Sequence, residues 1–327
     1  MTDNSDFVQT IHCGTLLSVM GLVMMASCSG SSLSAHQSTT EMKSMQKNKS
    51  ETSFIMVTTT DRGSCGATTD NELICWGIEN WKYQLNREID QLEGVADVVC
   101  SLYVDGQTVC QSFGSEDVRH EFDLEMREIS VGPTPLFDRF AGISGEGQIV
   151  EIRGPSWEIY EITEDGSGYS SVTAPHGGIC WLDDEQSVEC EENAGIDVEE
   201  QLLQDRYFEM IDCAAYYCCG IEDSGAVQCW GEDPEETLDL EIGRKTGVLS
   251  SPAGEFTELS VGVAHVCGIT REQELKCWGV DDYGLTDPPE GEFVSIAASA
   301  THNCAIDVHH GVECWGINEH GQTDPPK

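Results

Sequence analysis

Much of the chain beyond residue 53 consists of short runs in which apolar and polar positions alternate. Clear examples are Phe293–Ala297, Cys304–Val308 and Gly311–Trp315. β-Branched and aromatic residues are frequent in these runs, and Gly, Asp, Asn and Pro separate them. A period of two bounded by turn residues predicts β-strands. Since no long segment shows the helical period, we expect an all-β protein.

The strands belong to a repeating unit. An aromatic residue precedes a first cysteine by eleven positions, and a second cysteine follows the first by ten, often continuing as Cys-Trp-Gly. The units that keep this full spacing are Phe54/Cys65/Cys75, Tyr169/Cys180/Cys190, Phe208/Cys219/Cys229, Phe256/Cys267/Cys277 and Phe293/Cys304/Cys314. Repetition at this period indicates a repeat architecture.

Two further units are incomplete. One has Cys100 and Cys110 at the right separation, with a leading strand shortened to Val95–Val99. The other, built on Ile129–Gly132, Gly142–Ile143 and Gly147–Ile149, has lost both cysteines. Seven units result, spaced 35 to 48 residues apart.

A unit of about 40 residues with three clear strands and a weak fourth has the size of a propeller blade. A solenoid needs capping ends, which we do not see, whereas a closed ring needs none. We therefore predict a seven-bladed β-propeller over residues 53–327, with one disulfide inside most blades.

The cysteine spacing also predicts the disulfides. Residues ten apart in a strand–turn–strand segment can face each other across a hairpin, at a Cα separation that a disulfide accepts. The predicted pairs are Cys65–Cys75, Cys100–Cys110, Cys180–Cys190, Cys219–Cys229, Cys267–Cys277 and Cys304–Cys314, and the remaining Cys213 and Cys218 can pair with each other. Closing each eleven-residue loop is worth about 2.5–3 kcal/mol. A zinc site is the alternative, but the chain has no Cys-x-x-Cys and no His pair at zinc spacing, so we expect no metal.

Three local motifs resemble those of the regulator-of-chromosome-condensation repeat family. They are Val-Gly/Ala-x-x-His-x-Cys-Gly/Ala-Ile at Val261–Ile269, a Gly shortly before the second cysteine as at Gly225, and Trp-Gly-x-Asn-x-x-Gly-Gln at Trp315–Gln322. The resemblance covers most of residues 54–327 and implies a seven-bladed propeller. The units are shorter than typical family blades, and a disulfide in each blade is unlike the nuclear members. Nucleotide exchange and chromatin binding therefore do not carry over, and exported bacterial relatives that bind proteins are the better guide.

The N-terminal region predicts export. An apolar run at Thr15–Ala26 has the length of a signal-peptide core, and Met25–Cys28 resembles a bacterial lipobox in which Cys28 is lipidated. The run lacks the basic residues that normally precede it, since the first Lys is Lys43. We expect a signal peptide over residues 1–27, a flexible tether over 28–52, and a monomer secreted or held at the bacterial outer membrane by its lipid anchor.

Charge limits the partners. With 59 Asp and Glu against 16 Lys and Arg, the formal net charge is −43, which repels phosphate backbones and excludes nucleic-acid binding. We expect no cofactor; acidic loops could hold Ca²⁺, but no calcium-binding motif is present. The longest unit spacing includes an acidic segment, our candidate binding loop, with carboxylates at Glu232, Asp233, Glu235, Glu236, Asp239 and Glu241.

No catalytic motif stands out, so we predict no catalytic residues. His265 and His302 recur at one repeat position, which favours a structural role such as a hydrogen bond between blades, and the repeated Trp residues favour blade packing. The favoured function is an exported module that binds an unknown protein, or a glycan, through one propeller face. The alternatives are a hydrolase or lyase that uses paired carboxylates on a face, and a structural envelope component.

Overall fold

A computed structural model describes residues 52–112, 119–131, 139–153, 157–163, 168–175, 178–191, 206–234 and 246–327, together with Ile196 and Leu203. The described residues form small antiparallel sheets of three or four strands, in agreement with the all-β prediction. No helix within these ranges is long and apolar enough to cross a bilayer. The predicted signal peptide, Cys28 and the tether up to residue 51 lie outside the described residues.

Each of the seven sheets is built from one continuous stretch of chain. Blades 1 to 3 have four strands: β1 (Phe54–Thr59), β2 (Gly63–Thr68), β3 (Glu72–Gly77), β4 (Trp81–Gln84); β5 (Ile89–Val95), β6 (Val98–Tyr103), β7 (Thr108–Ser112), β8 (Arg119–Glu121); β9 (Met126–Val131), β10 (Arg139–Ser144), β11 (Ile149–Arg153), β12 (Glu158–Glu161). Blades 4 to 7 have three described strands: β13 (Ser171–Thr173), β14 (Cys180–Leu182), β15 (Val188–Cys190); β16 (Phe208–Cys213), β17 (Tyr217–Glu222), β18 (Val227–Gly231); β19 (Phe256–Val261), β20 (His265–Thr270), β21 (Leu275–Gly279); β22 (Phe293–Ala298), β23 (His302–Asp307), β24 (Val312–Gly316).

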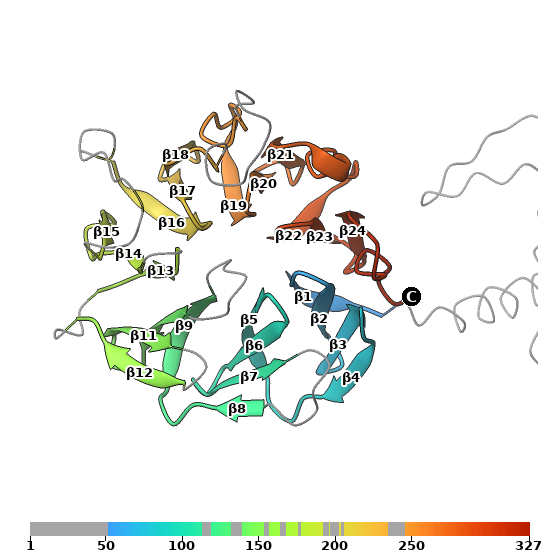
Figure 1. Cartoon of the computed structure of the whole chain (residues 1–327), viewed down its shortest axis with the longest axis horizontal. Helices are drawn as coiled ribbons and strands as arrows, with labels where there is room; N and C mark the ends of the chain where they lie inside the picture. Colours follow the sequence, from blue (N-terminus) through green and yellow to red (C-terminus); the bar gives the residue numbers. More distant parts are fainter. Residues whose placement is uncertain are drawn as a thin grey trace, which may run out of the picture. The chain divides into compact units, whose positions relative to one another are not determined.

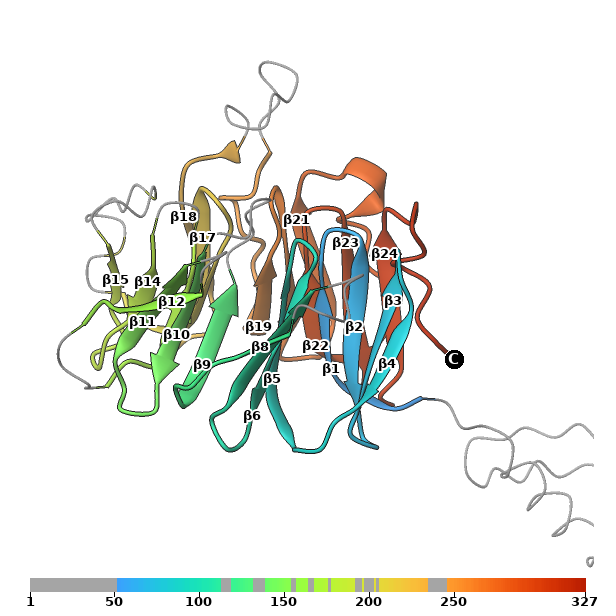
Figure 2. The ribbon, with the colours of Figure 1, turned by 60° about the horizontal axis from the view of Figure 1, so that its bottom comes forward.

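The sheets follow one another around a common centre, with the first strand of each blade innermost (Figure 1). This arrangement confirms the seven-bladed propeller. Since blades 1 and 7 share no strand, contacts between them close the ring: Phe54 N donates to His310 O at 2.9 Å, and Trp76 Nε1 donates to Gln322 O at 2.9 Å. Figure 2 shows the same ring from the side, with β24 beside β1–β3.

Disulfides join the second and third strands of six blades. Their cysteines face each other in register, at Cα separations of 4.0–4.1 Å: Cys65–Cys75, Cys100–Cys110, Cys180–Cys190, Cys219–Cys229, Cys267–Cys277 and Cys304–Cys314. A further disulfide, Cys213–Cys218, joins the first and second strands of blade 5. These are the pairs that the sequence spacing predicts.

Blade 3 replaces its disulfide by an ion-pair cluster. Ala141 and Glu151 face each other in register, ten residues apart, where the other blades have cysteines. The Glu151 side chain is fully buried, and its two oxygens lie 2.9 Å from Arg139 Nε and 2.5 Å from Arg153 Nη2. A buried carboxylate requires such partners. The blade that lost both cysteines therefore gained a charged contact between its second and third strands.

Blade 2 corrects one strand prediction. The leading strand is not Val95–Val99; it is β5, which ends at Val95, and β6 begins at Val98 after a two-residue turn in which Ala96 has φ 47°. The eleven-residue spacing from Cys100 leads to Ile89, the first residue of β5. Because Ile89 stands where other blades have an aromatic side chain, the start of this strand was missed.

Candidate binding face and central channel

The segments that follow Cys-Trp-Gly emerge on the same face of the ring in four consecutive blades. In each, the residue after the glycine donates a backbone hydrogen bond to the turn between the first two strands of its own blade. The bonds are Ile78 N to Arg62 O, Glu232 N to Tyr216 O, Val280 N to Ala264 O and Ile317 N to Thr301 O, at 2.8–3.0 Å. We call this side, formed by residues 78–80, 232–234, 280–287 and 317–324, the loop face. The opposite side, with the turns between second and third strands, is the hairpin face.

The glycine of Cys-Trp-Gly permits this close return of the chain. Gly77, Gly231, Gly279 and Gly316 all have φ between 106° and 122°. A Cβ atom on Gly77 would lie 2.5 Å from Arg62 O. Any other residue would combine a backbone conformation that suits only glycine with a steric clash, so the motif fixes where each loop leaves its blade.

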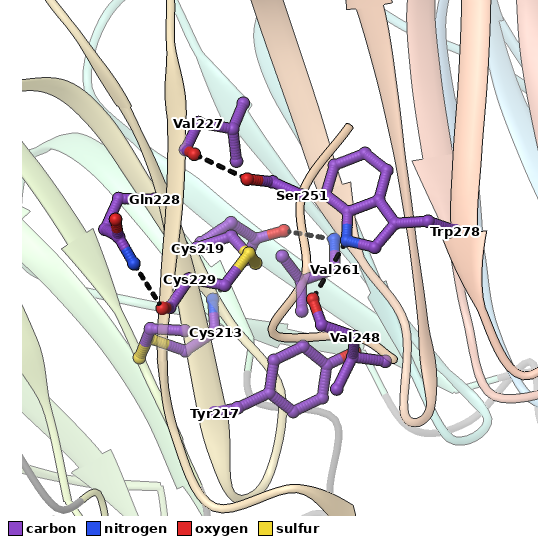
Figure 3. The surroundings of a disulfide bond; sticks show 12 residues. Cys213, Tyr217, Cys219, Val227, Gln228, Cys229, Val248, Ser251, Val261 and Trp278 are labelled. Atoms are coloured by element: carbon purple, nitrogen blue, oxygen red, sulfur yellow. Dashed lines mark hydrogen bonds between the residues drawn. A yellow bond between two sulfur atoms is a disulfide. The ribbon is translucent and has the colours of Figure 1, made fainter. Parts of the chain in front are cut away.

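The tryptophans of the motif attach the loops to the next blade. The indole nitrogens of Trp76, Trp278 and Trp315 donate to Gln322 O, Val248 O and Leu285 O, at 2.9–3.1 Å. Figure 3 shows the bond from Trp278 to Val248, beside the Cys219–Cys229 disulfide of the preceding blade. Each of these carbonyls belongs to the segment that follows the Cys-Trp-Gly of the preceding blade. Three of the four segments are therefore held both by a backbone bond within their own blade and by a tryptophan of the next blade.

Tyr283 is the most exposed large side chain on the loop face, with 75% of its surface accessible. It lies in η2 (Asp282–Gly284) and has φ 60° and ψ 23°, a left-handed conformation that is unfavourable for a tyrosine. His320 occupies the equivalent position of blade 7 and is also exposed. Sequence reasoning missed Tyr283; the correspondence between residues 278–284 and 315–321 was the signal that could have found it.

Carboxylates surround these side chains on the loop face. Exposed acidic residues follow the Cys-Trp-Gly motif in each of the four blades, at Glu79, Glu232, Asp281 and Glu319. The face thus combines exposed aromatic and apolar side chains with negative charge. This combination suits a protein surface that carries basic residues.

The candidate binding loop begins on this face. Glu232 is exposed, whereas Asp233 is half-buried and its Oδ1 accepts a hydrogen bond from Thr246 Oγ1 at 2.6 Å, which ties the two ends of the loop together. Glu235, Glu236, Asp239 and Glu241 lie outside the described residues. Asp233 therefore supports the base of the loop.

A central channel of about 790 Å³ runs between the innermost strands of all seven blades. Its polar side chains stand nine and seven residues before the first cysteine of a blade, on either side of a buried apolar residue, as Gln91 and Glu93 flank Leu92. The same pattern gives Asp212 in blade 5 and Glu258 in blade 6, and the degenerate blade 3 contributes Glu128. Sequence reasoning missed these carboxylates among the 59 acidic residues.

Three of the channel carboxylates tie adjacent blades together. Oxygens of Glu128, Glu258 and Asp212 accept backbone hydrogen bonds from the next blade, donated by Val172, Ile296 and Val261 at 2.7–2.9 Å. Gln91 makes the same contact with Ile129 N at 2.9 Å. These side chains satisfy backbone groups of the innermost strands, which is a structural role. Glu93 differs, since its Oε1 accepts a hydrogen bond from Gln91 Nε2 of its own strand, at 3.0 Å.

Burial raises the pKa of the four channel carboxyl groups named above, Glu93, Glu128, Asp212 and Glu258. The pKa of Glu93 rises to about 8 through desolvation, to which the negative charge of Asp212 adds. Desolvation also raises the pKa of Glu128 and Glu258 to about 7, and that of Asp212 to about 6, against the backbone hydrogen bonds that favour their ionised forms. Near neutral pH the channel therefore carries less negative charge than its composition indicates.

The two recurring histidines connect blades. His265 Nε2 lies 2.7 Å from Asn303 Oδ1, and His302 Nε2 lies 2.8 Å from Ser64 Oγ, in each case in the next blade. Both histidines are fully buried. Desolvation lowers the pKa of His265 and lowers that of His302 to about 3, so both are neutral. The expected hydrogen bond between blades is present for both.

Solved structures similar to this chain are propellers. They include the CRINKLY WD40 ectodomain of the Arabidopsis thaliana receptor kinase ACR4 (TM-score 0.60, 20% identity, covering 84% of this chain and all of that one). They also include the ectodomain of the Physcomitrella patens receptor kinase CR4 (0.59, 18%, 81% and 74%) and Prp20p of Saccharomyces cerevisiae (0.58, 10%, 81% and 83%), a yeast RCC1 protein studied for its binding to Gsp1p and histones. No protein-family model matches the chain, and no curated protein matches it significantly. At these identities the likeness concerns the fold.

Proposed function

We propose that this protein is an exported binding module whose loop face recognises a basic surface of another protein. The observation that carries the proposal is Tyr283, a large side chain that is three-quarters exposed on a left-handed backbone, between the two attachment points Val280 and Leu285 of its segment. A strained and exposed aromatic residue has no packing benefit in the free protein. In a complex it would supply the kind of aromatic anchor that dominates binding energy.

Three further features support the proposal. The disulfides in the described residues are typical of a protein that works in an oxidising compartment, in keeping with an exported protein tethered through Cys28. The negative charge of the loop face would steer a basic partner toward it. The chain is also similar in fold to Prp20p, a propeller whose binding to Gsp1p and histones has been described.

A catalytic alternative built on the channel carboxylates would use groups that already have a structural role. Glu128, Glu258 and Asp212 accept backbone hydrogen bonds that hold neighbouring blades together. Substituting them would therefore disturb the ring itself, whereas an exposed loop-face side chain such as Tyr283 can be changed without loss of packing. This difference favours the loop face as the functional surface.

The test is capture of a partner from envelope and culture-medium extracts by the oxidised full chain. Tyr283→Ala should abolish capture, because it removes the exposed ring while keeping a Cβ atom on the same backbone. The matched control is Tyr207→Ala, which removes a half-exposed tyrosine that precedes β16 on the hairpin face. Equal capture by both variants would refute the assignment to the loop face. If the captured material contains no protein and is released on adding a soluble glycan, the ligand is a carbohydrate.

A further inference from the structure

Three buried sulfur atoms from two adjacent blades lie together in the core between blades 4 and 5. The Sγ atoms of Cys180, Cys213 and Cys218 are all within 4.8 Å of one another. Cys180 belongs to β14 and is bonded to Cys190, whereas Cys213 and Cys218 are bonded to each other across β16 and β17. Two disulfides from different blades therefore lie with sulfur atoms within 4.8 Å of each other.

The second of these disulfides stands outside the repeat. In six blades the disulfide joins the second and third strands with a sequence separation of ten, whereas Cys213–Cys218 joins the first and second strands with a separation of five. Cys213 also contacts the preceding blade through its backbone, since its N–H donates to Thr173 Oγ1 at 3.1 Å. The additional disulfide thus lies beside the Cys180–Cys190 disulfide, with its sulfurs within 4.8 Å of Cys180 Sγ.

The four cysteines differ in accessibility. Cys180, Cys213 and Cys218 are 0–2% exposed, whereas Cys190 is partly exposed at the end of β15. Cys190 is therefore the one of the four at which we expect an external thiolate to attack. Attack on Cys190 makes Cys180 the leaving group, and this releases a thiolate within 4.8 Å of the neighbouring disulfide.

We propose that the four cysteines form a thiol–disulfide exchange site that captures an external thiol at Cys190 and links blades 4 and 5 covalently. In the first step the thiolate attacks Cys190 Sγ, forms a mixed disulfide and expels the Cys180 thiolate. In the second step Cys180 attacks the Cys213–Cys218 disulfide, bonds to one of its sulfurs and expels the other. The proton of the incoming thiol ends on the expelled cysteine.

The exchange conserves the number of disulfides. Two protein disulfides and one external thiol become a mixed disulfide at Cys190, a disulfide between Cys180 and Cys213 or Cys218, and one buried thiol. No separate oxidant or reductant is required. The second step also removes the Cys180 thiolate, which would otherwise attack the mixed disulfide and expel the captured thiol. The captured thiol is therefore retained at Cys190.

The experiment treats the oxidised full chain with reduced glutathione under native conditions, blocks free thiols with iodoacetamide, and maps disulfides by mass spectrometry without reduction. The expected result is glutathione on Cys190 together with a peptide that links Cys180 to Cys213 or Cys218. The partly exposed Cys277 and Cys314, in blades without an additional disulfide, serve as internal controls and should retain no glutathione.

A matched variant tests the second step. In Cys213→Ser combined with Cys218→Ser, Cys180 has no disulfide to attack, so retained glutathione at Cys190 should fall to the level at Cys277 and Cys314. Retention that is equal at the three positions in the wild-type chain, or an alkylated Cys180 beside a glutathionylated Cys190, would overturn the proposal. Because the wild-type comparison needs no variant, it decides the matter even if the double variant fails to fold.

Discussion

Glu93→Gln should make the protein less sensitive to pH. The Glu93 carboxyl group faces the central channel, and its pKa rises from 4.5 to about 8 because burial disfavours its charge and Asp212 adds repulsion. A glutamine has nearly the same shape and can still accept the hydrogen bond from Gln91. The substitution therefore removes the titration and leaves the packing of β5 intact.

The sign and size follow from proton linkage. Between pH 4.5 and 8 the folded chain holds a proton on Glu93 that the unfolded chain has released, so the free energy of unfolding falls as the pH rises. At about 1.36 kcal/mol for each pH unit, and with partial titration near pH 5, the loss between pH 5 and pH 7 is about 2.5 kcal/mol. Since the side chain keeps some contact with channel water, we expect about 2 kcal/mol.

The assay is urea unfolding of the oxidised protein at pH 5, 6, 7 and 8, followed by tryptophan fluorescence. The free energy of unfolding of Glu93→Gln, relative to that of the wild type, should rise by about 2 kcal/mol between pH 5 and pH 7. Glu146→Gln is the matched control, since it removes the same charge from an exposed turn between β10 and β11. A constant difference between Glu93→Gln and wild type at all four pH values would refute this account of the channel.

Further predictions concern blade 3, the loop face and the ring closure. Ala141→Cys with Glu151→Cys should form a blade-3 disulfide, detectable by mass spectrometry, because the two positions face each other ten residues apart; two free thiols would contradict the register. Tyr283→Gly should raise the free energy of unfolding by about 0.5–1 kcal/mol, measured by urea unfolding, because glycine tolerates φ 60°; a loss would contradict the strain. The pKa of His302, about 3, means that its contribution to stability is complete above pH 6.5 and is lost as the pH falls toward 3. His302→Asn should therefore flatten the pH dependence of stability below pH 6, and an unchanged slope in acid would contradict a buried neutral histidine.

The sequence predicted the ring because its strongest signals repeat. The Cys spacing and Cys-Trp-Gly report a hairpin register and a tight chain return, which are local properties of each blade. Only the leading strand of blade 2 was misplaced, because Ile89 stands at the aromatic position, a substitution that the hydrophobic core accepts. The sequence alone could not show that Glu151 replaces a cysteine, since a buried carboxylate is recognisable only once Arg139 and Arg153 are seen beside it.

The candidate site was less accessible to sequence reasoning. The acidic loop after Cys229 drew attention by its length and charge, whereas the described part of that loop shows Asp233 in a supporting role. Tyr283 was overlooked because it lies in a segment that matches the structural repeat. Its exposure depends on the fold of η2, which the sequence does not show. Which carboxylates face the channel depends on the arrangement of seven innermost strands, one from each sheet, around one axis. These are properties of the closed ring.

The most direct test of the central claim is site-specific photo-crosslinking on the loop face. A photoreactive phenylalanine analogue at position 283, in the oxidised full chain, should crosslink to one protein in envelope or medium extracts, and the yield should fall with increasing salt. The same analogue at position 207, on the hairpin face, should not crosslink to that protein. Equal crosslinking from both positions, or from position 207 alone, would contradict recognition through the loop face.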